Sequence, residues 1–146
     1  MRILLDTNLL VRAAITPDGL AQKLLRYIEE REEHVLVVSS HLLSEVADVL
    51  HRPRIQEHWP LSDEEIQSYC QYLSKAGHKV PAEPLSSVIS DPKDQAVVEA
   101  AVAGQANVIC TSDAHFYKSP AKEFLDEHGI SVLTDRALLA MFEKEP

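Results

Sequence analysis

Short apolar segments alternate along this chain with longer segments whose apolar residues recur at helical spacing. The first apolar segment, Arg2 to Leu5, ends abruptly at Asp6, and "HVLVVSS" and "NVICTSD" also end in polar residues. Strands that are apolar throughout are typical of a parallel sheet covered by helices on both faces. The alternation therefore predicts an α/β fold, because parallel strands are joined by helical crossovers.

The predicted elements cover most of the chain. Strands are expected within residues 2–5, 34–40, 78–81, 107–113 and 130–134, and helices within residues 18–31, 40–50, 62–77, 91–104, 121–128 and 135–143. Ser62 and Glu65 stand in capping-box register, and Asp91 can cap the helix that Gly104 ends. The segment 51–60 contains two prolines and is expected to be a loop or a short irregular turn.

This order predicts a three-layer α/β/α sandwich, Rossmann-like, with a parallel sheet of four to five strands. The length of 146 residues suits one domain with its own core, so we expect a single domain over residues 1–146. The chain has no apolar run of about 18 residues and no leader, which predicts a cytoplasmic protein without a membrane span. Cys70 and Cys110 are far apart in sequence and are expected to be reduced structural residues.

The net charge of -9 argues against a broad basic surface that grips nucleic acid through many phosphates. It does not exclude a nuclease. Acids that converge on divalent cations would contribute to this negative charge, and the bound cations would invert the local potential toward a phosphate backbone.

Several acids are expected to meet at one edge of the sheet. Asp6 and Asp113 directly follow predicted strands, and the carboxyl ends of parallel strands form the ligand-binding edge of such folds. Asp91 and Asp94 open a helix that can face the same edge, and Glu45 lies at the border of the apolar face of the helix 40–50. Each acid also has a simpler interpretation as a helix cap, a turn residue or a surface charge.

Carboxylates packed together without cations repel and raise one another's pKa values, so their convergence favours a metal site. Oxygen ligands alone point to Mg²⁺ or Mn²⁺, because zinc usually recruits His or Cys. The histidines show no HxxxH or HExxH spacing, and only His115 stands near the proposed site. Hydroxyl and amide side chains at the same strand ends could support the carboxylates: Thr7, Asn8, Ser39, Ser40, Thr111 and Ser112.

Four segments in register, "LLDTNLLV", "VVSSHLLSEV", "DPKDQAVVEAA" and "VICTSDAHF", resemble the PIN-domain ribonucleases, particularly the toxins of bacterial toxin–antitoxin pairs. The resemblance implies an acidic quartet, Asp6, Glu45, Asp94 and Asp113. It implies Asp91 as an additional acid and Asn8 and Thr111 as polar supports. Ser112 and Gln95 depart from the common pattern of the family, and neither removes a member of the quartet.

The resemblance further implies a Mg²⁺- or Mn²⁺-dependent endoribonuclease, often a homodimer and often inhibited by a cognate antitoxin protein. Arg12, Lys93, His115 and Lys118 are expected near the RNA substrate, although each could be only a surface residue. Trp59 and Tyr117 could stack on splayed bases or simply pack under a loop.

Two rival functions remain open at this point. One is a catalytically silent PIN-like module that binds RNA or a protein, against which the intact quartet argues. The other is a Mg²⁺ phosphotransfer domain. A phosphatase of that kind would have an acid where Asn8 stands, and a receiver domain would have an Asp at the end of "VVSS".

Overall fold

A five-stranded parallel sheet forms the centre of the protein, whose computed structural model describes residues 1–146. Its strands run in the order β3-β2-β1-β4-β5. Their bounds are β1 Arg2–Leu5, β2 Val35–Ser39, β3 His78–Val80, β4 Val108–Cys110 and β5 Ser131–Leu133. The middle strands are apolar and buried, as expected for a sheet covered on both faces.

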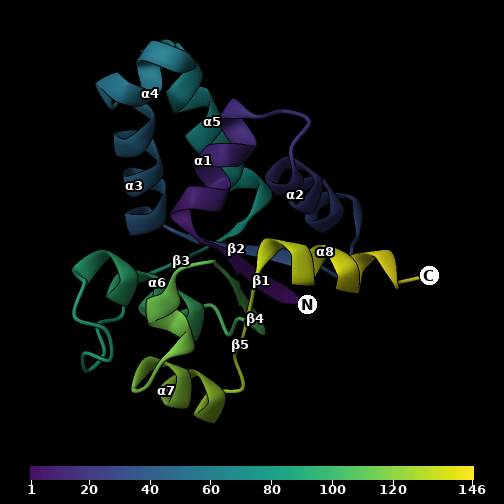
Figure 1. Ribbon diagram of the computed structural model, residues 1–146, viewed down its shortest axis with the longest axis vertical. Coiled ribbons are helices and arrows are strands. Elements are labelled where there is room, and N and C mark those ends of the chain that lie inside the picture. The colour runs from purple at the N-terminus through teal and green to yellow at the C-terminus, as the bar shows by residue number, and fades with distance from the viewer.

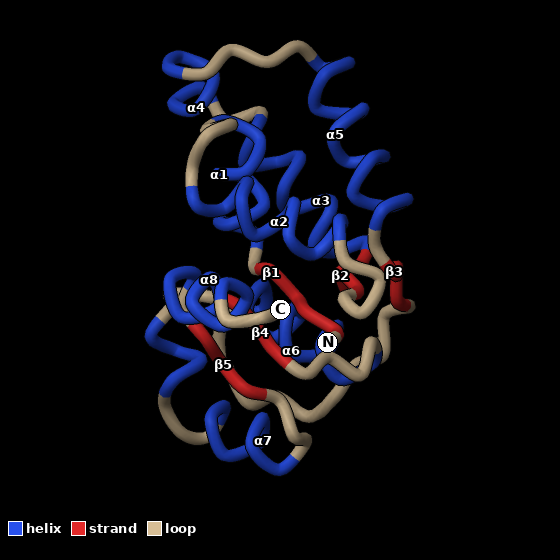
Figure 2. Tube along the Cα trace, turned by 90° about the vertical axis from the view of Figure 1, so that its right-hand side faces the viewer, coloured by secondary structure: helices blue, strands red, loops and turns tan.

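Helices cover the two faces of this sheet (Figure 1). The upper layer in that view contains α1 Thr7–Ile15, α2 Leu20–Glu30, α3 Ser40–Leu50 and α5 Asp63–Ala76, and α8 Asp135–Glu143 joins it by packing against α2. The lower layer contains α6 Pro92–Ala103 and α7 Ala121–Glu127. Figure 2 shows the strands as one layer between these helices. The predicted three-layer α/β/α sandwich is confirmed.

Local capping signals explain where several helices begin and end. Ser62 and Glu65 form the predicted capping box at the start of α5, and Gly77 ends that helix. Asp91 caps α6 by accepting a hydrogen bond from the Lys93 backbone N–H, and Gly104 follows the last residue of α6. Because these signals depend only on neighbouring residues, they were readable from the sequence.

Four elements differ from the sequence prediction, which gave no range for the helix α1. Residues 53–58 form a helix, α4 Pro53–His58, where a loop or irregular turn was expected. Proline suits the first turn of a helix, since the backbone N–H that it lacks would be unpaired there anyway. The helix predicted over 18–31 begins at Leu20, after a Gly19 cap. A 3₁₀ helix, η1 Ala114–Tyr117, follows Asp113 without having been predicted.

The order of the strands identifies the ligand-binding edge. β1 leads to β2 on one side, whereas β4 leads to β5 on the other, so the chain switches direction between β1 and β4. Crevices form beyond the carboxyl ends of the strands at such a switch point.

No helix of the protein is both long and apolar enough to cross a membrane.

Candidate metal centre at the carboxyl edge of the sheet

Asp6 occupies the switch point between β1 and β4. Its backbone N–H donates to the Cys110 carbonyl at 3.1 Å, which continues the pairing of the two strands by one residue. Its side chain caps α1, because Oδ1 accepts the Leu9 backbone N–H at 3.1 Å. Asp6 therefore follows the last residue of β1, caps the start of α1 and places its carboxylate at the carboxyl edge of the sheet.

The Asp6 carboxylate is buried and held by hydrogen bonds. Only 8% of the residue is exposed, and the buried Thr111 hydroxyl donates to Asp6 Oδ2. Burial raises the pKa of Asp6 above its ordinary value, and Asp113 adds to the rise, while the Thr111 and Leu9 hydrogen bonds and nearby Arg12 oppose it. The site therefore disfavours a negative charge on Asp6 unless a cation compensates it.

Asp94 and Asp113 both contact the same ring nitrogen of His115. His115 Nδ1 is 3.3 Å from Asp94 Oδ2 and 3.3 Å from Asp113 Oδ1. The Asp113 carboxylate also accepts the His115 backbone N–H at 2.9 Å, and the Asp113 backbone N–H donates to the Thr111 hydroxyl at 3.1 Å. Burial raises the pKa of Asp94, and repulsion from Asp113 and Asp91 adds to this effect, whereas His115 lowers it.

Glu45 enters the same region from α3. Its carboxylate forms an ion pair with Lys93 of α6, with 3.3 Å between Lys93 Nζ and Glu45 Oε1. The Glu45 side chain is 20% exposed and that of Lys93 is 62% exposed, so the lysine lies over the carboxylate on the solvent side. This pair links helices from the two layers of the sandwich.

All four carboxylates of the predicted quartet line one cavity of about 130 Å³. Its remaining wall is formed by Thr7, Asn8, Val49, Arg52, Asp91, Lys93, Val97 and Phe116. Arg52 was missed by the sequence prediction, since it lies just before α4 in the segment expected to be a loop. It is the arginine in this wall and shares the cavity with the four carboxylates.

A second cavity of about 150 Å³ adjoins the acidic one. The two cavities share Thr7, Glu45, Lys93 and Val97, so the Glu45–Lys93 ion pair belongs to both. Leu42, Pro92 and Ala96 add apolar surface to the second cavity, while Ser39 and His41 add polar groups. The cavity therefore combines apolar surface with hydrogen-bonding groups, as is typical of binding sites for small organic groups.

Gln95 fixes the loop that leads into the acidic helix α6. Its Oε1 accepts the backbone N–H groups of Val88 and Ile89 at 3.0 and 3.3 Å, and its Nε2 donates to the Ser86 carbonyl at 3.3 Å. Nε2 also donates to Glu99 at 3.2 Å. An ionised carboxylate at this position could accept hydrogen bonds but could not donate one to the Ser86 carbonyl. An amide side chain next to Asp94 can do both.

The other predicted site residues are more peripheral. Arg12 lies 3.5 Å from Asp135 and does not line the acidic cavity, and neither do Ser112 and Lys118. Trp59 is 42% exposed at the end of α4, away from the cavity wall. Tyr117 donates its hydroxyl to the Thr111 carbonyl at 2.7 Å, which fixes the ring beside β4. The substrate contacts of these residues remain predictions.

The donor set fits a hard divalent cation. Asp94 and Asp113 offer oxygens that lie with His115 Nδ1 within 4.8 Å of one another, and Asp6 lies on the same cavity wall. Carboxylate oxygens are the ligands that Mg²⁺ and Mn²⁺ prefer. The two cysteines take no part: both are free, and burial raises the pKa of the Cys110 thiol to about 12.

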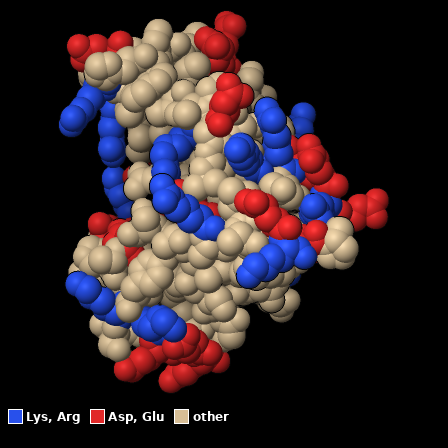
Figure 3. All heavy atoms as spheres, turned by 45° about the vertical axis from the view of Figure 1, so that its right-hand side comes forward, with Lys and Arg blue, Asp and Glu red and all other residues tan.

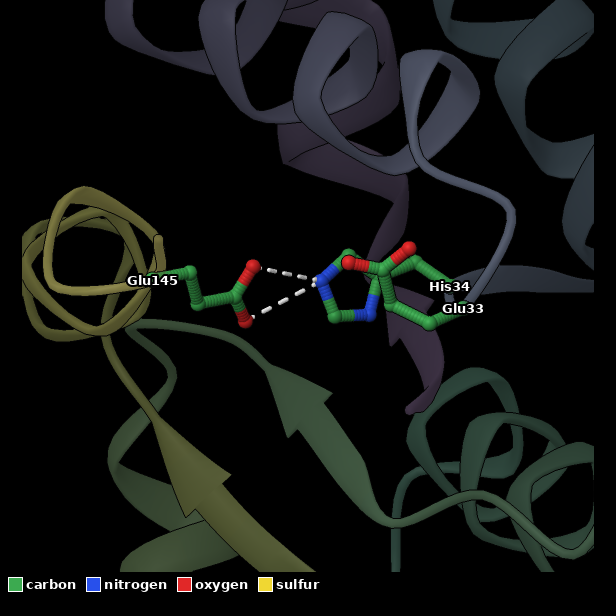
Figure 4. A group of neighbouring side chains, drawn as sticks. All are labelled: Glu33, His34 and Glu145. Atoms are coloured by element: carbon green, nitrogen blue, oxygen red, sulfur yellow. Dashed lines mark hydrogen bonds and ion pairs between the residues drawn. The ribbon is translucent and has the colours of Figure 1, made fainter.

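A second group of histidine and carboxylates lies at the opposite end of the strands (Figure 4). His34 Nε2 contacts both carboxylate oxygens of Glu145 at 3.0 and 3.1 Å, and its other ring nitrogen lies 3.0 Å from the Met1 amine. Phe142 packs against the His34 ring, with 5.0 Å between the ring centroids. Since both ring nitrogens are engaged, this group connects α8 to the sheet rather than offering a metal ligand.

Charges on the surface are mixed. On the face drawn in Figure 3, Lys and Arg side chains are interspersed with acidic ones rather than gathered into one patch. This distribution agrees with the net charge of -9 and with a local site rather than a broad basic surface.

Comparison with known proteins gives one matching family and a similar fold. The sequence model of the PIN domain matches residues 2–115. The chain is also similar to the crystal structure of VapBC2 from Rickettsia felis bound to a DNA fragment from their promoter, with a TM-score of 0.62 and 16% sequence identity. That alignment covers 92% of this chain and 98% of the other, and at this identity it shows a shared fold. The comparison with curated proteins gives no match.

Proposed function

Because this chain belongs to the PIN-domain family, we propose that it is a Mg²⁺- or Mn²⁺-dependent endoribonuclease. The observation that carries the proposal is the convergence of Asp6, Glu45, Asp94 and Asp113 on one cavity at the switch point of the sheet. Burial raises the pKa values of Asp6 and Asp94, and repulsion from Asp113 adds to both, so negative charge on these carboxylates is costly without a compensating cation.

In this proposal, Asp6, Asp94 and Asp113 hold the cation, and Glu45 completes the shell or orients the attacking water. A bound divalent cation supplies an activated water and stabilises the negative charge that grows on the phosphate. Thr111 keeps the Asp6 carboxylate oriented, and Asn8 and Asp91 supply further polar groups on the cavity wall. Lys93 and Arg52 lie where they can attract the phosphate backbone of RNA.

The reaction is hydrolysis of a phosphodiester bond. The water oxygen bonds to phosphorus, the bond from phosphorus to the 3′ oxygen breaks, and that oxygen takes up a proton. The products are a 5′ phosphate and a 3′ hydroxyl.

The biological setting that we propose is that of a toxin in a toxin–antitoxin pair, with an antitoxin protein as partner and a homodimer as the assembly. The similarity in fold to VapBC2, a complex crystallised on promoter DNA, supports this setting. Size-exclusion chromatography with light scattering measures the mass of the assembly. A homodimer should have twice the chain mass of 16.3 kDa.

The proposed activity is tested by incubating the purified chain with single-stranded RNA, structured RNA and DNA of the same sequence. With Mn²⁺ or Mg²⁺ present, we expect internal cleavage of RNA that leaves 5′ phosphates, and excess EDTA should abolish it. The Asp6→Asn variant serves as the inactive control.

A catalytically silent binding module is the second candidate. The ion pairs of Glu45 with Lys93 and of Asp94 with His115 favour it, because they compensate part of the negative charge without a metal. RNA that is bound by the chain but left uncut with either metal would support this alternative.

A further inference from the structure

The ring of His115 lies against carboxylates of the proposed metal site, whereas three other histidines are held elsewhere in the protein. His34 is held by Glu145, His51 by Asp63 and the Ala47 carbonyl, and His128 by the Phe124 carbonyl. His115 instead directs Nδ1 between Asp94 and Asp113, at 3.3 Å from an oxygen of each. These are two of the carboxylates to which the proposed function assigns a cation.

The position of this ring is set by the backbone. Asp113 caps η1, and its carboxylate accepts the His115 N–H at 2.9 Å. The same residue therefore offers a carboxylate to the site and fixes the start of the short helix that carries the imidazole. The ring is 61% exposed, so nothing above it obstructs a small shift toward a shared ion.

The spacing of these atoms suits joint ligation. Ligands at neighbouring corners of an octahedral ion, each about 2.1 Å from it, are separated by about 3 Å. The separations of 3.3 Å from Nδ1 to the two carboxylate oxygens are close to this value. An imidazole that only formed an ion pair would occupy the same place, so a measurement has to separate the two roles.

We infer that His115 Nδ1 is a metal ligand, and that it makes this a mixed nitrogen and oxygen site that favours Mn²⁺ over Mg²⁺. The inference rests on the proposed function, since it requires the cation assigned to Asp94 and Asp113. Imidazole binds first-row transition metals readily, whereas Mg²⁺ prefers oxygen ligands. The added nitrogen ligand thus shifts the preference of the site from Mg²⁺ toward Mn²⁺.

Pulsed EPR of Mn²⁺ bound to the full chain, without RNA, tests the inference directly. A nitrogen ligand produces hyperfine coupling between the unpaired electrons of Mn²⁺ and the nitrogen nucleus. This signal does not depend on catalytic activity. We expect this coupling in the wild type and in His128→Ala, a matched control at the exposed end of α7, and not in His115→Ala.

Calorimetric titration supplies the second readout. In His115→Ala we expect Mn²⁺ affinity to fall by about tenfold or more, with a change in Mg²⁺ affinity below about threefold. Bound Mn²⁺ without nitrogen coupling, or coupling that survives in His115→Ala, overturns the role of His115 and leaves the proposed metal site standing. Failure of the wild type to bind Mn²⁺ overturns both.

Discussion

The Thr111 hydroxyl donates a hydrogen bond to Asp6 Oδ2 across the boundary between β4 and β1. Thr111 is fully buried, and the same hydroxyl accepts the Asp113 backbone N–H at 3.1 Å. A single side chain therefore orients one acid of the site through its carboxylate and a second through its backbone. Loss of this hydroxyl should affect both acids.

Thr111→Val tests this relationship, because valine has nearly the shape of threonine without the hydroxyl. We expect unfolding free energy to fall by about 2 kcal/mol at pH 7, since a buried carboxylate loses a donor. Mn²⁺ affinity should fall as well. Urea unfolding and metal titration are the measurements, with Thr111→Ser as the control that keeps the hydroxyl. Equal losses in the two variants would assign the effect to packing.

The pKa of Asp6 makes the stability of the metal-free protein depend on pH. Burial raises this pKa above the ordinary value of 3.8, so the folded state retains the proton to higher pH than the unfolded state does. Stability is therefore highest below the unfolded pKa and declines as pH rises through the folded one. Asp6→Asn removes this decline while keeping a side chain that caps helices well.

We accordingly expect Asp6→Asn to raise the melting temperature of the metal-free protein at pH 7 by about 3 °C, the effect of roughly 1 kcal/mol in a chain of this size. At pH 4 the difference should be much smaller. Melting curves in EDTA at both pH values measure it. A variant that is less stable than the wild type at pH 7 contradicts the strain assigned to this carboxylate.

Lys93 should affect metal and RNA in opposite directions. Lys93→Gln removes the positive charge 3.3 Å from Glu45, so Mn²⁺ should bind severalfold more tightly while KM for RNA rises. Unfolding free energy should change by less than about 0.5 kcal/mol, because the lysine is mostly exposed. Lys122→Gln, which breaks an exposed pair with Asp126 on α7, is the control. Parallel changes in metal and RNA affinity would refute the opposing roles.

Gln95 is expected to act through the loop before α6. Gln95→Ala removes two accepted backbone hydrogen bonds, at 3.0 and 3.3 Å, and should lower unfolding free energy by about 2 kcal/mol. Hydrogen exchange at Val88 and Ile89 should accelerate, while exchange in β1, the central strand of the sheet, should not change. Gln71→Ala, an exposed change on α5, is the matched control. If hydrogen exchange at the Val88 and Ile89 amides did not change, the proposed role of Gln95 in holding this loop would be wrong.

The class of fold could be predicted from the sequence because its signals are local. Apolar strands, the Ser62–Glu65 capping box and the Asp91 cap depend on residues near one another in the chain. The helix α4 was missed because proline was interpreted only as a helix breaker, although Pro53 lies in the first turn, where it is tolerated.

The site residues that could be predicted are those that the topology of the sheet places side by side. Asp6 and Asp113 follow adjacent parallel strands, so their approach could be expected from topology. Arg52 lies in the turn between α3 and α4, and the hydrogen bonds of Gln95 depend on the backbone of a loop without periodicity. Neither feature leaves a pattern in a single sequence.

The central claim is tested most directly by the rate of RNA cleavage against Mn²⁺ concentration for wild type and Asp94→Asn. The change removes one charge from the proposed metal shell and keeps nearly the same shape, so we expect the rate to fall by about a hundredfold or more with folding intact. Asp126→Asn, an exposed change on α7, should cleave at the wild-type rate. An Asp94→Asn protein that folds normally and cleaves RNA as fast as the wild type would contradict the account.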